Sequence, residues 1–397
     1  MKRSIAEEQG ERPSERGGRE DHQVERIRLA IAGVGNCASA LVQGIAFYAR
    51  RGAERPVGLM RPDIGGYGPA TVEPVAAFDV DVRKVGLPLE EAVFAPPNCA
   101  RVFESALPAS GVRVSMGPVL DGVARHMADH AEEEAFRVAD VAPVDVAATL
   151  RAAEAEVLVC YLPVGSERAV RHYAEACLLA GVALVNCVPV FLASDGEWAG
   201  RFREAGLPLV GDDVKSQVGA TIVHRTLARL LADRGVELDR TYQLNTGGNT
   251  DFLNMLERDR LRSKKVSKTE SVQSQLDVRL ATEDIHIGPS DYVRWQGDNK
   301  VAFIRAEGRG FGDLPIELEL RLSVQDSPNS AGVVIDAIRC AKLGLDRGLA
   351  GPLEAASAYY MKSPPIQLRD EEARRRLDAF IETKPLERVA DTSPDDG

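Results

Sequence analysis

Residues 27–44 read IRLAIAGVGNCASALVQG, and this stretch decides the fold. The apolar run 27–32 has the length of a buried strand, and helical periodicity follows the glycines. Between them, Gly33, Gly35 and Ala38 have the G-x-G-x-x-(G/A) spacing of a dinucleotide-binding turn. The first glycine allows a tight turn, the second lets backbone approach a pyrophosphate, and the third small residue permits close helix packing. We therefore predict a cofactor site at the turn and first helical residues: Gly33, Gly35, Asn36, Cys37, Ala38 and Ser39.

Strand and helix patterns alternate along the chain to about residue 242. Apolar runs predict strands at 75–81, 157–161, 182–188 and 207–211. Helical periodicity predicts helices at about 118–136, 143–153, 166–181 and 217–235, with a short one near Trp198. A Gly- and Pro-rich insertion loop occupies 51–74. Repeating strand–helix units of this kind predict an α/β fold with a doubly wound parallel sheet.

The pattern changes after about residue 242. Residues 300–308 (KVAFIRAEG) and 314–326 (LPIELELRLSVQD) alternate apolar and polar side chains, which is typical of antiparallel strands. Helical periodicity returns at 329–348 and near 353–361. The chain therefore carries a second, smaller α+β region after the parallel sheet.

Composition excludes several classes of protein. The net charge of −11 over 397 residues argues against a nucleic-acid surface. No run of eighteen apolar residues is present, so we expect no membrane span. Residues 1–25 are polar without the apolar core of a secretion signal, and we expect a disordered tail. The six cysteines are irregularly spaced, which fits buried free thiols in a reducing cytoplasm.

Acidic residues stand where the second strand ends. Asp79 is placed to bind the adenosine ribose diol, which favours NAD over NADP, and Asp81 is a substitute. The acid follows Gly35 at a longer distance than usual because the loop 51–74 intervenes. The alternative is that Asp79 only caps a turn.

Ligands of doubly wound sheets bind at the carboxyl ends of the strands. Pro163 and Gly165 follow the strand that ends at Tyr161, Val188 and Pro189 follow the next, and GDDVKS at 211–216 follows a third. In that motif Asp212, Asp213 and Lys215 suit proton transfer or cation binding. The alternative for Asp213 is a helix N-cap.

The basic run RSKKVSK at 262–268 follows a loop-like stretch, NTGGNTDFLNM, at 245–255. A continuous helix would place Lys264 and Lys268 on one face. Alternatively, residues 267–270 form a capping box with Ser267 as N-cap. Either arrangement suits an anion such as phosphate, although such runs are usually solvated helix faces.

Two more lysines stand out by their surroundings. Lys300 precedes an apolar strand, and Lys362 lies in YYMKSPP, where aromatic residues and prolines favour partial burial. Burial lowers the pKa of a lysine and suits it to proton transfer. Asp326 ends a strand before a helix, as an N-cap or as the partner of a catalytic lysine. The histidines have no HxxxH spacing, so we predict no zinc site built by protein ligands.

Taken together, the motifs resemble those of the inositol-1-phosphate synthases (inositol-3-phosphate synthases) of bacteria and archaea. The matching stretches, in order from about residue 27 to 365, are AGVGNCASALVQG, FDVD, GDDVKS, NTGGNTDFLNM, RSKKVSK, SDYVRWQGDNK, QDSPNSAGVVIDA and YYMKSPP. The resemblance implies conversion of D-glucose 6-phosphate to 1D-myo-inositol 3-phosphate with NAD. The implied steps are oxidation at C5, enolisation, intramolecular aldol closure and re-reduction, with no net redox change.

The resemblance also implies the residues that act. Matched motif by motif, the catalytic set is Lys264, Lys268, Lys300, Lys362, Asp213, Asp251, Asp326 and Asn249. We expect Lys268 and Lys300 to hold the phosphate. Lys264 and Lys362 are expected to handle protons and oxyanions. Lys265 is left out of the set. Implied cofactor contacts add Asp79, Tyr161, Pro163, Asp212 and Lys215 to the turn.

The family fold is a Rossmann domain carrying an inserted α+β catalytic and oligomerisation domain. It divides the chain into a tail at 1–25, a Rossmann domain at 26–244, the insertion at 245–326, and a returning segment at 327–397. The resemblance further implies a homotetramer. A divalent metal or a monovalent cation is also implied, for which the carboxylates of 211–216 are the expected hosts; its identity is open.

Two other hypotheses explain part of the sequence. A conventional NAD-dependent dehydrogenase explains the glycine turn but not four lysines spread over three motifs. A catalytically idle NAD-binding protein would be expected to lack at least one motif lysine, and none is missing.

Overall fold

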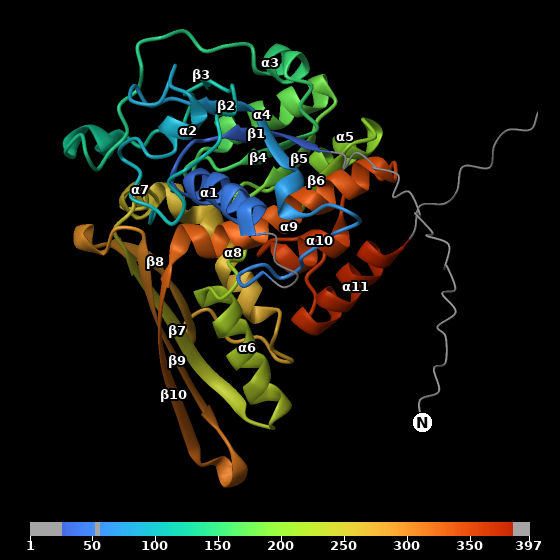
Figure 1. Ribbon diagram of the computed structural model, residues 1–397. Coiled ribbons are helices and arrows are strands. Elements are labelled where there is room, and N and C mark those ends of the chain that lie inside the picture. The colour runs from blue at the N-terminus through green and yellow to red at the C-terminus, as the bar shows by residue number, and fades with distance from the viewer. Residues whose placement is uncertain (1–25, 52–55, 384–397) are drawn as a thin grey trace, which may run out of the picture.

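A computed structural model describes residues 26–51 and 56–383 (Figure 1). The tail expected at 1–25 lies outside the described residues. Seven parallel strands form one sheet in the order β11-β6-β5-β4-β1-β2-β3. Their bounds are β1 Ile27–Ala32, β2 Val72–Asp79, β3 Val114–Met116, β4 Val157–Cys160, β5 Ala183–Asn186, β6 Pro208–Val210 and β11 Gly351–Pro352. This order, with helices on both faces, confirms the predicted doubly wound sheet.

Alternating side chains of each strand pack into two apolar layers, one on each face of the sheet. In β1, Ile27, Leu29 and Ile31 pack on one face, whereas Ala30 and Ala32 pack on the other. The first face is covered by α1 (Asn36–Arg51), α9 (Asp326–Asp346) and α10 (Glu354–Tyr360). The opposite face is covered by α3 (Val146–Ala152), α4 (Glu167–Ala180) and α5 (Gly196–Glu204). Short α2 (Leu89–Ala92) and C-terminal α11 (Asp370–Glu382) lie at the margins.

A second sheet has the order β10-β9-β7-β8 and projects away from the first (Figure 1). Its strands are β7 Glu237–Gly247, β8 Ile285–Tyr292, β9 Asn299–Arg309 and β10 Pro315–Gln325. The predicted antiparallel pairing of the last two is confirmed. One face packs against α6 (Ala220–Asp233) and α8 (Arg262–Gln273), while α7 (Thr250–Asn254) precedes α8. Because this sheet begins at Glu237, the change of architecture falls before residue 245.

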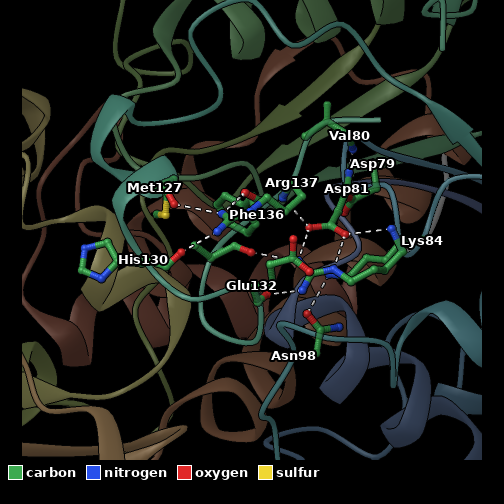
Figure 2. A network of polar contacts seen from close by, with 12 residues as sticks. Asp79, Val80, Asp81, Lys84, Asn98, Met127, His130, Glu132, Phe136 and Arg137 are labelled. Atoms are coloured by element: carbon green, nitrogen blue, oxygen red, sulfur yellow. Dashed lines mark hydrogen bonds and ion pairs between the residues drawn. The ribbon is translucent and has the colours of Figure 1, made fainter. Parts of the chain in front are cut away.

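The helix predicted at 118–136 is wrong, since only Arg125–Asp129 form a short 3₁₀ helix there. The backbone of this stretch bonds elsewhere. The carbonyls of Glu132 and Ala135 accept from the Arg83 guanidinium, and those of Met127, His130 and Phe136 accept from Arg137 (Figure 2). These long-range partners take the place of helical hydrogen bonds.

None of the described helices has the length and apolar character that a membrane crossing needs.

Candidate active site

Residues of both sheets line a cleft of about 180 Å³ at the carboxyl ends of β1, β4 and β5. All eight residues expected to be catalytic border it: Asn249, Asp213, Asp251, Asp326, Lys264, Lys268, Lys300 and Lys362. Gly35, Asn36, Cys37, Tyr161 and Pro163 border it as well. The fold therefore brings segments as distant as residues 35 and 362 to one place.

Helix α8 carries the basic run into the cleft. It is continuous from Arg262, so Lys264 and Lys268 share one face and the capping-box alternative is wrong. Ser267 lies inside the helix, buried, and its Oγ donates to Asp213 Oδ2 at 2.7 Å. Lys265 on the same helix is exposed to solvent.

Lys362 and Asp213 form a buried ion pair. Lys362 Nζ lies 2.8 Å from Asp213 Oδ1, and the Lys362 amide donates to the Asp213 carbonyl at 2.7 Å. Asp213 adopts a left-handed backbone conformation with φ of 62°, which is uncommon for residues other than glycine. The N-cap alternative for Asp213 is wrong, because Gly219 occupies the N-cap of α6.

Two further pairs complete the cluster. Lys264 Nζ lies 2.9 Å from Asp251 Oδ2, and Lys300 Nζ lies 3.2 Å from Asp326 Oδ1. Asn249 is the N-cap of α7, and its Oδ1 accepts from the amides of Asp251 and Phe252. Capping therefore fixes the start of the short helix that carries Asp251.

Lys268 differs from the other three lysines because it has no ion-pair partner in the described part of the chain. Burial lowers the pKa of its ammonium well below the ordinary value, and the charges of Lys264, Lys300 and Lys362 lower it further. Burial likewise lowers the pKa of Lys362, although Asp213 opposes the shift. Burial opposes charge on Lys264 too, but Asp251 prevails and raises the pKa of that lysine. The cluster thus lacks one negative charge, which an anionic ligand would supply.

The glycine turn leaves room for a ligand. Gly33 has φ of +92°, and a Cβ there would lie 3.0 Å from the Tyr161 carbonyl oxygen. At Gly35 no heavy atom lies within 4 Å of the corresponding position. An adjoining cavity of about 60 Å³ is lined by both glycines and by Asp79. The open backbone and the carboxylate at the end of β2 fit the pyrophosphate and ribose of NAD.

Asp79 also caps the turn. Its Oδ2 accepts from the Val34 amide at 2.7 Å, and its Oδ1 accepts from the amides of Val80 and Asp81. Beneath the turn, the buried Lys84 Nζ donates to the Val34 carbonyl at 2.8 Å. Asp81, the substitute for Asp79, is fully buried and pairs with Arg83, so it is absent from both cavity walls.

Asp212 and Lys215, both expected at the cofactor, lie outside the cleft. Asp212 is buried, accepts from Asn186 Nδ2 at 2.7 Å and from backbone amides of 192–194, and burial raises its pKa to about 6. Lys215 donates to the Ala358 carbonyl at 2.9 Å and pairs with Asp370, and burial lowers its pKa to about 7. Across residues 26–51 and 56–383, no group of three His, Cys, Asp or Glu side chains is arranged to hold a metal ion.

The first turn of α1 is divided between the cleft and the core. Ala38 and Ser39 are buried, whereas Cys37 faces the cleft 4.0 Å from Ser327 Oγ. Burial raises the pKa of the Cys37 thiol to about 12. Asn36 Oδ1 accepts from the amides of Cys99 and Ala100.

Sequence reasoning missed residues that only the fold brings to the site. Asp298 is buried and accepts from Asn249 Nδ2 at 2.9 Å and from Ser327 Oγ at 2.7 Å, linking the stretches that carry Asp251, Lys300 and Asp326. Burial, followed by the charge of Asp326, raises its pKa to about 6. Its position two residues before Lys300 was the available signal. Gln243 and Phe136 also line the cleft, with no signal in the sequence, and so does Ser330 of the stretch QDSPNSAGVVIDA.

A doubly wound sheet, a glycine turn and a lysine-rich cleft at the strand ends define the class of Rossmann-fold enzymes with an anion site. A family model described as myo-inositol-1-phosphate synthase matches residues 219–327. An inositol-3-phosphate synthase of Mycolicibacterium smegmatis is 57% identical, over 90% of this chain and 98% of the relative. One of Corynebacterium glutamicum is 53% identical, over 89% and 98%. The crystal structure of Ari2 aligns with a TM-score of 0.72 and 38% identity, over 90% and 100%. The chain therefore belongs to the inositol-3-phosphate synthase family and is an enzyme.

Proposed function

We propose that this protein converts D-glucose 6-phosphate to 1D-myo-inositol 3-phosphate, with NAD as a cofactor that undergoes no net change. The observation that carries the proposal is the group of four lysines that meet three carboxylates beside the glycine turn. NAD would supply a hydride acceptor at C5 and return the hydride after ring closure. Family membership supports the substrate, and the open space at Gly35 with Asp79 supports the cofactor.

The phosphate of the substrate is assigned to Lys268 and Lys300. Lys268 lies among three like charges and forms no ion pair with any described residue, so a bound phosphate would relieve the repulsion. Lys300 lies on the neighbouring wall of the cleft, where its Nζ stays 3.2 Å from Asp326 Oδ1. An ammonium group held in a buried site binds a phosphate oxygen more strongly than one in water.

Proton transfer is assigned to Lys362. Because its pKa is lowered, Lys362 loses its proton at a lower pH than an ordinary lysine and can then act as a base. Asp213 Oδ1 lies 2.8 Å from Lys362 Nζ and fixes the position of the amine. Lys264 remains charged because Asp251 raises its pKa, which suits it to stabilising oxyanions at C5 and C1. These roles match enolisation at C6 and aldol attack on the C1 aldehyde.

A homotetramer assembled through the second sheet is part of the proposal. Exposed apolar side chains gather on this sheet and its connecting turn: Leu244, Phe303, Phe311, Leu314 and Ile316. An apolar surface of this kind on an extended sheet supports burial against another copy.

The test incubates the protein with glucose 6-phosphate and NAD and measures periodate-releasable phosphate. We expect release at catalytic concentrations of NAD with no net change in NADH absorbance. Stoichiometric NADH would instead support a conventional dehydrogenase. No release across a series of monovalent and divalent cations would overturn the proposal.

A further inference from the structure

A segment far from the motifs forms part of the wall of the cleft. Residues 121–139, the bridging segment, are tied to the end of β2, where the Ala139 amide donates to the Val80 carbonyl at 2.9 Å. On the other side, His126 Nε2 donates to the Leu253 carbonyl of α7 at 2.8 Å, and Glu134 pairs with Arg294 at 2.5 Å. The segment thus joins the end of β2 in the Rossmann sheet to the second region.

Phe136 of this segment borders both cavities. It lines the lysine cleft and also the smaller cavity that holds Asp79. Gly35 borders both cavities as well, and the space above its backbone is open. A dinucleotide that runs from Asp79 into the lysine cleft must therefore pass between Gly35 and the wall that contains Phe136.

A partly buried polar network holds Phe136 in place. Arg83 Nη2 donates to Asp81 Oδ2 at 2.6 Å and to the carbonyl of Ala135, the residue before Phe136, at 2.8 Å. Asp81 Oδ2 also accepts from the Arg137 amide, the residue after it, at 3.0 Å. Figure 2 shows Asp81, just after β2, facing the part of the bridging segment that carries Phe136 and Arg137. Both peptide groups next to Phe136 are thereby tied to one ion pair, in which the Asp81 carboxylate is fully buried and the Arg83 guanidinium is partly exposed.

We propose that Phe136 contacts the bound dinucleotide and that Arg83, acting with Asp81, is its positioning residue, so that the cofactor stays on the enzyme between two hydride transfers. This inference rests on the proposed function. A redox-neutral reaction fails if NADH dissociates after the first transfer, because the sugar is then left oxidised at C5 with no hydride to recover. A wall over the middle of the dinucleotide slows that loss without taking part in the chemistry.

The experiment measures the dissociation rate of NADH from the full-length protein by stopped-flow fluorescence with excess NAD as competitor. For Phe136→Ala we expect an increase of about tenfold or more, equivalent to about 1.4 kcal/mol of lost binding. Arg83→Gln is also expected to raise the NADH dissociation rate. Arg83→Lys should give a rate between those of wild type and Arg83→Gln. During turnover, Phe136→Ala and Arg83→Gln should each release NADH and the oxidised sugar phosphate in equal amounts.

Arg113→Gln is the matched control, since Arg113 Nη1 also donates to a backbone carbonyl, that of Gly86 at 2.8 Å, but lies outside both cavities. It should behave as wild type. If Arg83→Gln fails to fold, Phe136→Ala decides the matter alone, because the Phe136 side chain takes no part in the polar network. Wild-type dissociation rates in Phe136→Ala would overturn this inference. A wild-type protein that binds no NADH would overturn the proposed function instead.

Discussion

Lys362 Nζ and Ser267 Oγ each bind one oxygen of the Asp213 carboxylate, at 2.8 Å and 2.7 Å. One side chain thus joins the loop after β6, the middle of α8 and the segment after α10. Because Lys268 follows Ser267 directly, Asp213 also fixes the position of Lys268.

Replacing Asp213 by Asn should remove catalysis while leaving the cofactor in place. Without the carboxylate, nothing at this position offsets the burial that lowers the pKa of Lys362, and the amine loses its orientation. We expect kcat to fall by about 10²–10⁴-fold, the range for lost acid–base catalysis. Steady-state kinetics and NADH fluorescence titration measure the two properties separately.

Asp212→Asn is the contrasting variant. Asp212 accepts from the backbone of 192–194 outside the cleft, so its loss should lower the free energy of unfolding by about 1–3 kcal/mol, as for unsatisfied buried groups. Its kcat should stay near wild type. Equal loss of kcat in both variants would contradict the separate roles assigned to these neighbours.

Lys268→Met should give a protein that is inactive but more stable than wild type. Folding depresses the pKa of Lys268, so the unfolded chain binds more protons between that lowered pKa and the ordinary 10.5. The free energy of unfolding therefore rises with pH through this window in the wild type. The variant lacks this dependence, and its advantage in Tm should shrink as pH approaches 10. Turnover should fall by about 10²–10³-fold or more.

Inorganic phosphate provides a second readout for the same variant. It should raise the Tm of the wild type, because a ligand that binds only the folded state stabilises it. The Lys268→Met protein should respond weakly. An equal response in both proteins would remove Lys268 from the phosphate site.

Two glycine variants should separate folding from cofactor binding. Gly33→Ala forces a side chain into a backbone conformation with φ of +92°, 3.0 Å from the Tyr161 carbonyl, and should lower Tm as well as NADH affinity. Gly35→Ala meets no heavy atom within 4 Å and should keep the Tm of the cofactor-free protein. Its methyl group occupies the space assigned to the pyrophosphate, so we expect NADH affinity to fall about tenfold or more. Unchanged affinity in Gly35→Ala would contradict the assigned path of the cofactor.

Asp298→Asn should change the pH dependence of stability. The folded protein holds a proton on Asp298 up to a pKa of about 6, compared with 3.8 for an ordinary aspartate. The folded state therefore binds more protons in that window, and this group makes the wild type lose stability as pH rises from about 4 to 6. This difference in pKa corresponds to a loss of roughly 3 kcal/mol in the free energy of unfolding of the wild type. The variant should not show this loss. Denaturant unfolding at pH 4, 5, 6 and 7 measures the difference; parallel curves for the two proteins would exclude this role.

The glycine turn and the four lysines could be predicted because each lies in a local pattern that fits its place in the fold. Gly33, Gly35 and Ala38 are spaced for one turn, and Lys264 and Lys268 are spaced for one helical face. Phe136 and Asp298 could not be predicted in this way. Their importance depends on partners distant in the sequence, such as Arg83 for the segment that carries Phe136 and Ser327 for Asp298.

The motif GDDVKS illustrates a different limit. Its residues are adjacent in sequence, yet Asp213, Val214 and Ser216 line the cleft, while Asp212 and Lys215 are buried in other contacts. The two carboxylates have different partners, Asn186 for Asp212 and Lys362 for Asp213, and no feature of the sequence predicts this division. Likewise, the helical periodicity of 118–136 is overridden by arginine side chains that compete for its carbonyl groups.

Helix α9 and strand β11 have a consequence for how the chain is made. The parallel sheet receives its buried covering helix and its edge strand from residues 326–352, after the whole second sheet has been inserted. During synthesis, β1 to β6 leave the ribosome well before the helix that covers them. The nascent Rossmann half therefore exposes an apolar face until the last quarter of the chain emerges, and it is a natural client for chaperones. A fragment that stops after α6 would contain the complete glycine turn and still lack the core that supports it.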